Sequence, residues 1–171
     1  MRKIFLKLKS WGLGNILLGL LALYMLATRL PSAWEAYSSQ GQQVPLMQVQ
    51  SLPLMQQMDF PTQSQVVVFW ATWCGPCEVE LERLQAMIER GELSAGQVLA
   101  ISSFEDPAMV LDHVQKMGWT FSVAVDVDGV VARSYQVRGT PTLVVFDSDR
   151  RVLWRTTGVS PSLELRLKTW F

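Results

Sequence analysis

VVVFWATWCGPC, residues 66–77, is the stretch that decides the fold of this 171-residue chain. Its β-branched and aromatic residues are typical of a buried strand. They run straight into two cysteines, Cys74 and Cys77, which are separated by Gly-Pro and are the only cysteines of the chain. A 3.6-residue apolar period follows and predicts a helix, so Cys74 lies where a strand gives way to a helix.

This position favours a reactive thiol. Unpaired backbone N–H groups and the positive end of the helix dipole stabilise a thiolate at a helix N-terminus. We therefore expect the pKa of the Cys74 thiol to lie near neutrality or below, against about 8.5 for a free thiol. Pro76 fits the first helical turn and stiffens the spacer that holds both sulfurs within bridging distance. The pattern predicts a redox-active disulfide, Cys74–Cys77.

Half of a zinc site and a pair of buried structural cysteines are the alternatives. Zinc would need two further ligands, and the chain offers one histidine, His113, and no third cysteine. His113 falls off the apolar stripe of its predicted helix, so we expect it at the surface. Met47, Met55 and Met58 suggest a soft-metal site, but methionines also fill gaps in apolar surfaces. We expect no metal site and no cofactor.

The N-terminus predicts a membrane anchor. Residues 10–28 carry no charge over 19 positions, which at 1.5 Å per residue is about 28 Å, close to a bilayer core. A cleaved signal peptide is the alternative, but the apolar run is long and residues 26–33 offer no good cleavage site. We expect membrane attachment through residues 11–30. Basic residues precede the run and indicate a cytoplasmic N-terminus: Arg2, Lys3, Lys7 and Lys9.

The sequence therefore predicts a single-pass protein of the cytoplasmic membrane with a periplasmic catalytic domain. Its parts are a basic tip and transmembrane anchor in residues 1–30, a linker in 31–44 and a folded domain in 45–171. From residue 31 onward there are ten basic and fifteen acidic residues, which argues against a nucleic-acid partner.

The folded domain alternates strand and helix patterns, which predicts an α/β mixed sheet flanked by helices. Right-handed crossovers would bring the cysteines to the carboxyl end of a central strand. In chain order we expect a strand or hairpin at 46–54, strands at 66–70 and 98–102, a helix from Asp106-Pro107 to Gly118, a strand at 121–125, a short helix through Tyr135, a hairpin of 143–146 with 152–157, and a helix from Leu163.

With WCGPC after one apolar strand and Gly139-Thr-Pro141 before another, the chain resembles the thioredoxin superfamily over roughly residues 45–171. The resemblance implies a thioredoxin-like fold behind one N-terminal transmembrane helix. It also implies a cis Pro141 that packs against the disulfide, and backbone hydrogen bonds from Thr140 to a bound substrate.

An extra helix and strand between Ser102 and Val127, together with the anchor, narrow the resemblance to TlpA-like, membrane-anchored thiol:disulfide oxidoreductases. Relatives serve cytochrome c maturation or suppression of copper sensitivity, and residues 156–171, TTGVSPSLELRLKTWF, are similar to the suppressor-of-copper-sensitivity D type. The partners implied are protein thiols and disulfides. With no third cysteine to relay electrons, a separate membrane redox partner must regenerate the active state.

One position departs from the thioredoxin pattern. Thioredoxins carry a buried aspartate just before Phe-Trp-Ala, where this chain has Val68. Glu80 lies three residues beyond Cys77 at the edge of the helix's buried face, and many TlpA-like proteins share this glutamate. It could accept the proton of the Cys77 thiol, unless it is an ordinary exposed glutamate. Glu78 and Glu82 point elsewhere, as solvated acids of the first turns.

The sequence thus predicts dithiol–disulfide exchange, in the reductive direction, by Cys74, Cys77 and Glu80. A handler of Cu(I) that uses the cysteines as ligands is the alternative, although Sco-type metallochaperones space their cysteines one residue wider and add a histidine. A non-catalytic interaction domain is disfavoured, because both cysteines and the proline are intact. The docking surface is predicted to consist of Trp73, Gly75, Pro76, Thr140 and Pro141.

Overall fold

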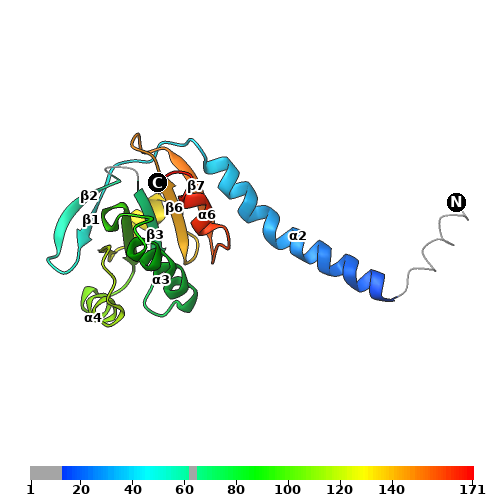
Figure 1. The fold of residues 1–171 in the computed structure, drawn as a ribbon, viewed down its shortest axis with the longest axis horizontal. Helices are drawn as coiled ribbons and strands as arrows, with labels where there is room; N and C mark the ends of the chain where they lie inside the picture. The colour runs from blue at the N-terminus through cyan, green and yellow to red at the C-terminus, as the bar shows by residue number, and fades with distance from the viewer. Residues whose placement is uncertain (1–12, 62–64) are drawn as a thin grey trace, which may run out of the picture. The chain divides into compact units, whose positions relative to one another are not determined.

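The computed structural model describes residues 13–61 and 65–171, and the chain divides into two compact units, Met1–Glu35 and Ala36–Phe171 (Figure 1). The helix α2 (Leu13–Ser39) continues well into the predicted linker. Within the described ranges, no helix combines the length and the hydropathy that crossing a membrane requires. The start of the predicted anchor, with its four leading basic residues, lies outside the described residues.

A seven-stranded mixed sheet organises the second unit, in the order β2-β1-β5-β4-β3-β6-β7. β3, β4 and β5 run parallel, and the other pairs are antiparallel, which confirms the predicted mixed sheet. The strands are β1 (Met47–Ser51), β2 (Gln56–Phe60), β3 (Gln65–Trp70), β4 (Val98–Ser103), β5 (Ser122–Asp126), β6 (Thr142–Phe146) and β7 (Val152–Thr157).

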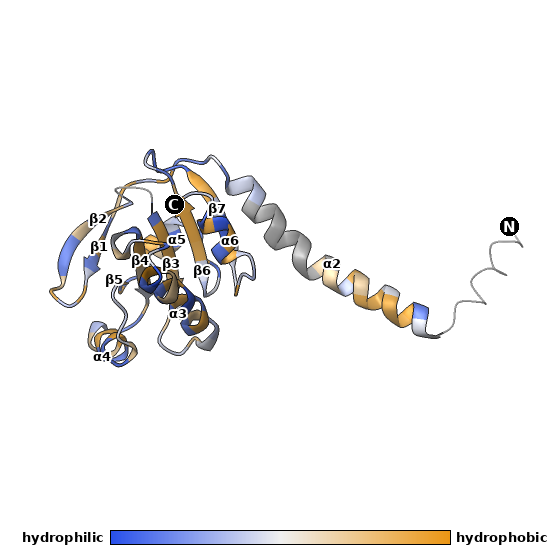
Figure 2. Cartoon of the chain, in the orientation of Figure 1, coloured by the Kyte–Doolittle hydropathy of each residue, from blue (hydrophilic) through white to orange (hydrophobic). Residues whose placement is uncertain are grey.

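The residues of β3 alternate between two hydrophobic cores, because successive side chains of a strand point to opposite faces. Val66, Val68 and Trp70 join the core beneath α3 (Gly75–Glu89), α4 (Pro107–Met117) and α6 (Leu163–Leu167). Val67 and Phe69 join the core beneath α5 (Val130–Ser134). The strand is buried along its whole length and runs between β4 and β6, and Figure 2 colours the chain by hydropathy.

Local signals account for the ends of α4. The Asp106 carboxylate accepts a hydrogen bond of 2.8 Å from the Ala108 N–H, and Pro107 occupies the first turn. Gly118 ends the helix at φ 68°, a left-handed conformation that glycine adopts without a steric penalty. The predicted helix from Asp106-Pro107 to Gly118 is confirmed.

The structure makes two predictions more precise, one for the N-terminal hairpin of the domain and one for its C-terminal helix. The predicted strand or hairpin near residues 46–54 is the hairpin of β1 and β2, and it places Met47 and Met58 against the second core. These two methionines fill an apolar surface, while Met55 is exposed. The terminal helix is shorter than predicted, because Trp170 and Phe171 follow α6 without being helical and pack on the first core.

Candidate functional site

The two cysteines form a disulfide at the start of α3, with a Cα–Cα distance of 5.2 Å. Cys74 is the N-cap residue, and its carbonyl accepts the N–H groups of Cys77 at 2.9 Å and Glu78 at 3.3 Å. Cys74 is 4% exposed and Cys77 0%, so Cys74 is the cysteine that keeps some exposed surface. A partner must come up to this edge to reach it.

The cis-proline loop reaches the same edge of the sheet. β3 and β6 are antiparallel with Phe69 opposite Thr142, so the loop that ends at Pro141 leads into β6 at the end where β3 finishes. The Thr140–Pro141 bond is cis, as the resemblance implied. The Pro141 carbonyl accepts the Gly158 N–H at 2.8 Å, which ties this loop to the end of β7. The loop therefore borders the segment that leads into Cys74.

The surface around Cys74 is open. Trp73 is 78% exposed, and Gly75 and Pro76 are exposed as well. Thr140 is half-buried and Pro141 is buried.

Glu80 is more deeply buried than the helix periodicity predicted. It is 1% exposed rather than at the edge of the buried face, because the segment before α6 covers it. The Ser160 N–H donates to its Oε1, and Arg83 Nη1 donates to its Oε2 at 3.0 Å. The same Arg83 nitrogen donates to the Ser160 carbonyl at 2.7 Å. A closed network thus holds this carboxylate on the Cys77 side of α3.

Val68 occupies the position of the thioredoxin aspartate, and it is fully buried in the first core. An apolar side chain cannot accept a proton, so this strand position contributes packing alone. Glu80 lies one helical turn beyond Cys77, on the same face of α3. It is a buried carboxylate close in sequence to Cys77.

Glu105 belongs to the site, and the sequence reasoning missed it. It follows β4, and its carboxylate accepts the Thr72 N–H at 3.0 and 3.2 Å and the Thr72 hydroxyl at 2.6 Å. The Ser102 hydroxyl donates to it at 2.5 Å. Thr72 lies two residues before Cys74, so Glu105 fixes the turn that enters α3. The predicted parallel pairing of β3 and β4 could have revealed this contact, because it brings the carboxyl ends of the two strands together.

The surface position predicted for His113 was wrong. His113 is half-buried between the rings of Trp70 and Trp119, at centroid distances of 5.5 and 5.9 Å. Its Nε2 lies 3.3 Å from Oε1 of Glu78, so this acid of the first turn of α3 contacts α4 and stays partly exposed. The cause is the packing of α4 against the end of β3. Across the described part of the chain, no group of three or more histidine, cysteine or acidic side chains is arranged to hold a metal ion.

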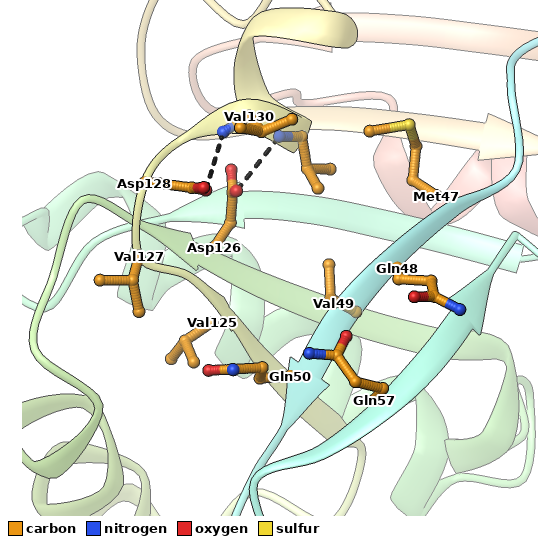
Figure 3. Close-up of a pocket in the computed structure, with 11 residues that line it drawn as sticks. Met47, Gln48, Val49, Gln50, Gln57, Val125, Asp126, Val127, Asp128 and Val130 are labelled. Atoms are coloured by element: carbon orange, nitrogen blue, oxygen red, sulfur yellow. Dashed lines mark hydrogen bonds between the residues drawn. The ribbon is translucent and has the colours of Figure 1, made fainter.

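A separate hollow of about 350 Å³ lies between β1 and the turn from β5 to α5 (Figure 3). The Asp126 carboxylate on its wall accepts N–H groups of Val131 at 3.1 Å and Ala132 at 2.8 Å and the Ser103 hydroxyl at 3.1 Å. These bonds begin α5 and join it to β4. We assign this carboxylate a structural role.

The fold and site define a thioredoxin-like protein, and residues 40–155 match the AhpC/TSA family. The chain belongs to that family. This confirms the resemblance to the thioredoxin superfamily, while the similarity of residues 156–171 to the copper-sensitivity suppressors stays a prediction.

Named relatives are thiol-disulfide oxidoreductases. The chain is 29% identical to the thiol-disulfide oxidoreductase ResA of Bacillus thuringiensis subsp. konkukian over 90 residues, which are 53% of this chain and 52% of that protein. It is 23% identical to the sporulation thiol-disulfide oxidoreductase A of Bacillus subtilis, over 63% of this chain and 66% of that one. The chain thus spans about half the length of the first of these relatives.

The solved structures agree in fold. The thioredoxin domain of a thiol-disulfide oxidoreductase from Bacteroides vulgatus superposes with a TM-score of 0.66 at 14% identity, over 77% of this chain and 96% of that one. At this identity the likeness concerns the fold alone. The thioredoxin-like α/β fold predicted from the sequence is confirmed.

Proposed function

We propose that this chain is a thiol:disulfide oxidoreductase that exchanges a dithiol for a disulfide through Cys74 and Cys77. The observation that carries the proposal is the Cys74–Cys77 disulfide at the first turn of α3, beside a cis-proline loop at the same edge of the sheet. The names of the relatives support the same chemistry.

In the reductive direction, the Cys74 thiolate attacks one sulfur of a partner disulfide. The partner's S–S bond breaks, its second sulfur leaves as a thiolate, and a mixed disulfide forms. The Cys77 thiolate then attacks Sγ of Cys74, which releases the partner's first sulfur. Two electrons pass to the partner, and the chain is left with the Cys74–Cys77 disulfide.

Glu80 takes the proton of the Cys77 thiol in this scheme. Its burial one turn beyond Cys77 supports the role, and so does Val68 in place of the thioredoxin aspartate. The bonds from Arg83 and the Ser160 N–H hold the carboxylate in place. Trp73, Gly75, Pro76, Thr140 and Pro141 form the surface on which the partner docks.

The Gly-Pro spacer resembles that of reducing thioredoxins, and we assign the chain to the reductive direction. Equilibrating the full chain in detergent with glutathione buffers, then alkylating and resolving the free thiols, gives its reduction potential. We expect a value near the thioredoxin potential of about −270 mV. A potential near about −120 mV would instead make the chain an oxidant, without affecting the exchange chemistry itself.

The catalytic domain lies in the periplasm in this proposal, tethered to the cytoplasmic membrane through residues 11–30 with the N-terminus in the cytoplasm. The uncharged run after Arg2, Lys3, Lys7 and Lys9 supports this topology. A separate membrane redox partner returns the disulfide to the dithiol. Protease added to spheroplasts should remove the domain but leave the N-terminal tip protected, and full protection of the domain would contradict the topology.

A further inference from the structure

Two aromatic side chains are exposed where β3 and β4 end. Trp73, 78% exposed, follows β3, and Phe104, 63% exposed, follows β4. The two strands are parallel neighbours with Trp70 opposite Ser102, so their carboxyl ends meet at one edge of the sheet. Both rings therefore belong to the edge at which Cys74 borders the surface.

Hydrogen bonds fix the backbone between these aromatics. Thr72 precedes Trp73 and Glu105 follows Phe104, and the Glu105 carboxylate accepts both the N–H and the hydroxyl of Thr72. The hydroxyl of Ser102 donates to the same carboxylate. The Glu105 carboxylate thus fixes both loops, the one that carries Trp73 and the one that carries Phe104.

Phe104 is exposed and adopts a backbone conformation that is unfavourable for a non-glycine residue. Its φ is 63°, in the left-handed region that few non-glycine residues adopt, and its N–H donates to the Asp126 carbonyl at 3.1 Å. The ring lies over Gly129, where an added Cβ would come within 1.9 Å of it. The guanidinium of Arg133 lies 5.8 Å from the ring centroid. This strained backbone holds the ring against Gly129 and Arg133 and still leaves Phe104 63% exposed, which points to a role in binding.

We propose that Phe104 and Trp73 together bind the polypeptide segment that flanks the partner's disulfide, with Phe104 taking an apolar side chain of that segment. This inference rests on the proposed function. The strand order places β3, which leads to Cys74, between β4, which leads to Phe104, and β6, which follows the Thr140–Pro141 loop. A segment whose cysteine reaches Cys74 has to cross this edge, and its residues on one side of the cysteine meet the Phe104 ring.

The test compares the full-length chain with its Phe104→Ala variant on three disulfide substrates. One is a small aromatic disulfide, and two are peptides with a glutathione mixed disulfide, which carry either leucine or serine two residues from the cysteine. We expect Phe104→Ala to lower kcat/KM about tenfold for the leucine peptide, as for loss of a good interface anchor, and to leave the other two substrates unchanged. Leu165→Ala, which removes an exposed apolar side chain on α6, is the matched control and should change none of them.

Gly129→Ala is a second variant, which displaces the Phe104 ring without removing it. It should also lower kcat/KM selectively for the leucine peptide. Equal rates for wild type and Phe104→Ala on the leucine peptide would overturn the inference, and so would an equal loss on all three substrates. Calorimetry with a cysteine-free leucine peptide measures docking without exchange. If wild type binds this peptide and Phe104→Ala does not, the inference that Phe104 docks the partner is supported. This result stands even if the chain exchanges no disulfide, so failure of the proposed function is distinguished from failure of the inference. If Phe104→Ala abolishes self-association of the chain instead, the occupant is a second copy and the inference is wrong.

Discussion

The two cysteines have differently built surroundings, although each has a carboxylate nearby. On the Cys77 side, Glu80 is 1% exposed and is held by Arg83 and the Ser160 N–H. On the Cys74 side, Glu105 is only half-buried and holds Thr72, next to the exposed Trp73. One carboxylate lies inside a closed network, and the other fixes an open loop.

The difference separates two tasks. A buried carboxylate close to the resolving cysteine is suited to taking a proton, because water competes little for it there. A half-buried carboxylate that accepts three contacts from Thr72 is suited to fixing the geometry of a docking loop. We therefore assign proton transfer to the Cys77 side and partner binding to the Cys74 side.

The largest effect is expected from the cysteines themselves. Cys74→Ser should lower turnover of a disulfide substrate by at least about 10³-fold, because the nucleophile is lost. Cys77→Ser should also stop turnover, yet still consume one equivalent of substrate as a mixed disulfide. Thiol release followed by absorbance distinguishes the two variants. If the two behaved alike, the assignment of attacking and resolving cysteines would be wrong.

Glu80→Gln should come next, slowing the resolving step by about 10²-fold at pH 7, since the carboxylate is replaced by a group that cannot accept a proton. The loss should shrink as pH rises, because hydroxide then removes the Cys77 proton without help. Rapid-mixing measurement of mixed-disulfide decay from pH 6 to 9 checks this. Glu82→Gln, on an exposed site of the same helix, is the control. A loss independent of pH would mean that Glu80 acts through packing.

Glu105→Gln is expected to have an intermediate effect. It removes the charge from a group that accepts hydrogen bonds from Thr72 and Ser102, which should lower the free energy of unfolding by about 1–3 kcal/mol. Urea unfolding measures the change. The pH profile of mixed-disulfide decay should keep its wild-type shape. A profile like that of Glu80→Gln would remove the distinction between the two sides.

The smallest effect is expected at His113. His113→Phe keeps an aromatic ring between Trp70 and Trp119 and removes the partly exposed contact with Glu78. We expect a change of less than about 1 kcal/mol in the free energy of unfolding. Glu78→Gln in the same urea experiment should match it, and a much larger loss in His113→Phe alone would indicate a role beyond this pair.

Local patterns predicted most of the elements, and the resemblance predicted the cis-proline. The Asp106-Pro107 start and the Gly118 end of α4 need only neighbouring residues, and so does the apolar run of β3. The surroundings of the carboxylates depend on distant segments. Glu80 is buried by Ser160, 80 positions away, and Glu105 meets Thr72 across 33 positions, so helix periodicity could place neither. The burial of His113 likewise depends on the packing of α4 against Trp70, which the sequence pattern of α4 alone could not predict.

Trapping the mixed disulfide shows whether Cys74 initiates the exchange. The full-length Cys77→Ser variant is reduced, freed of reductant and mixed with a glutathionylated peptide, and the products are analysed by mass spectrometry under non-reducing conditions. The account predicts one covalent adduct per chain, joined through Cys74 and absent from Cys74→Ser. No adduct, or an equal yield from both variants, would contradict it.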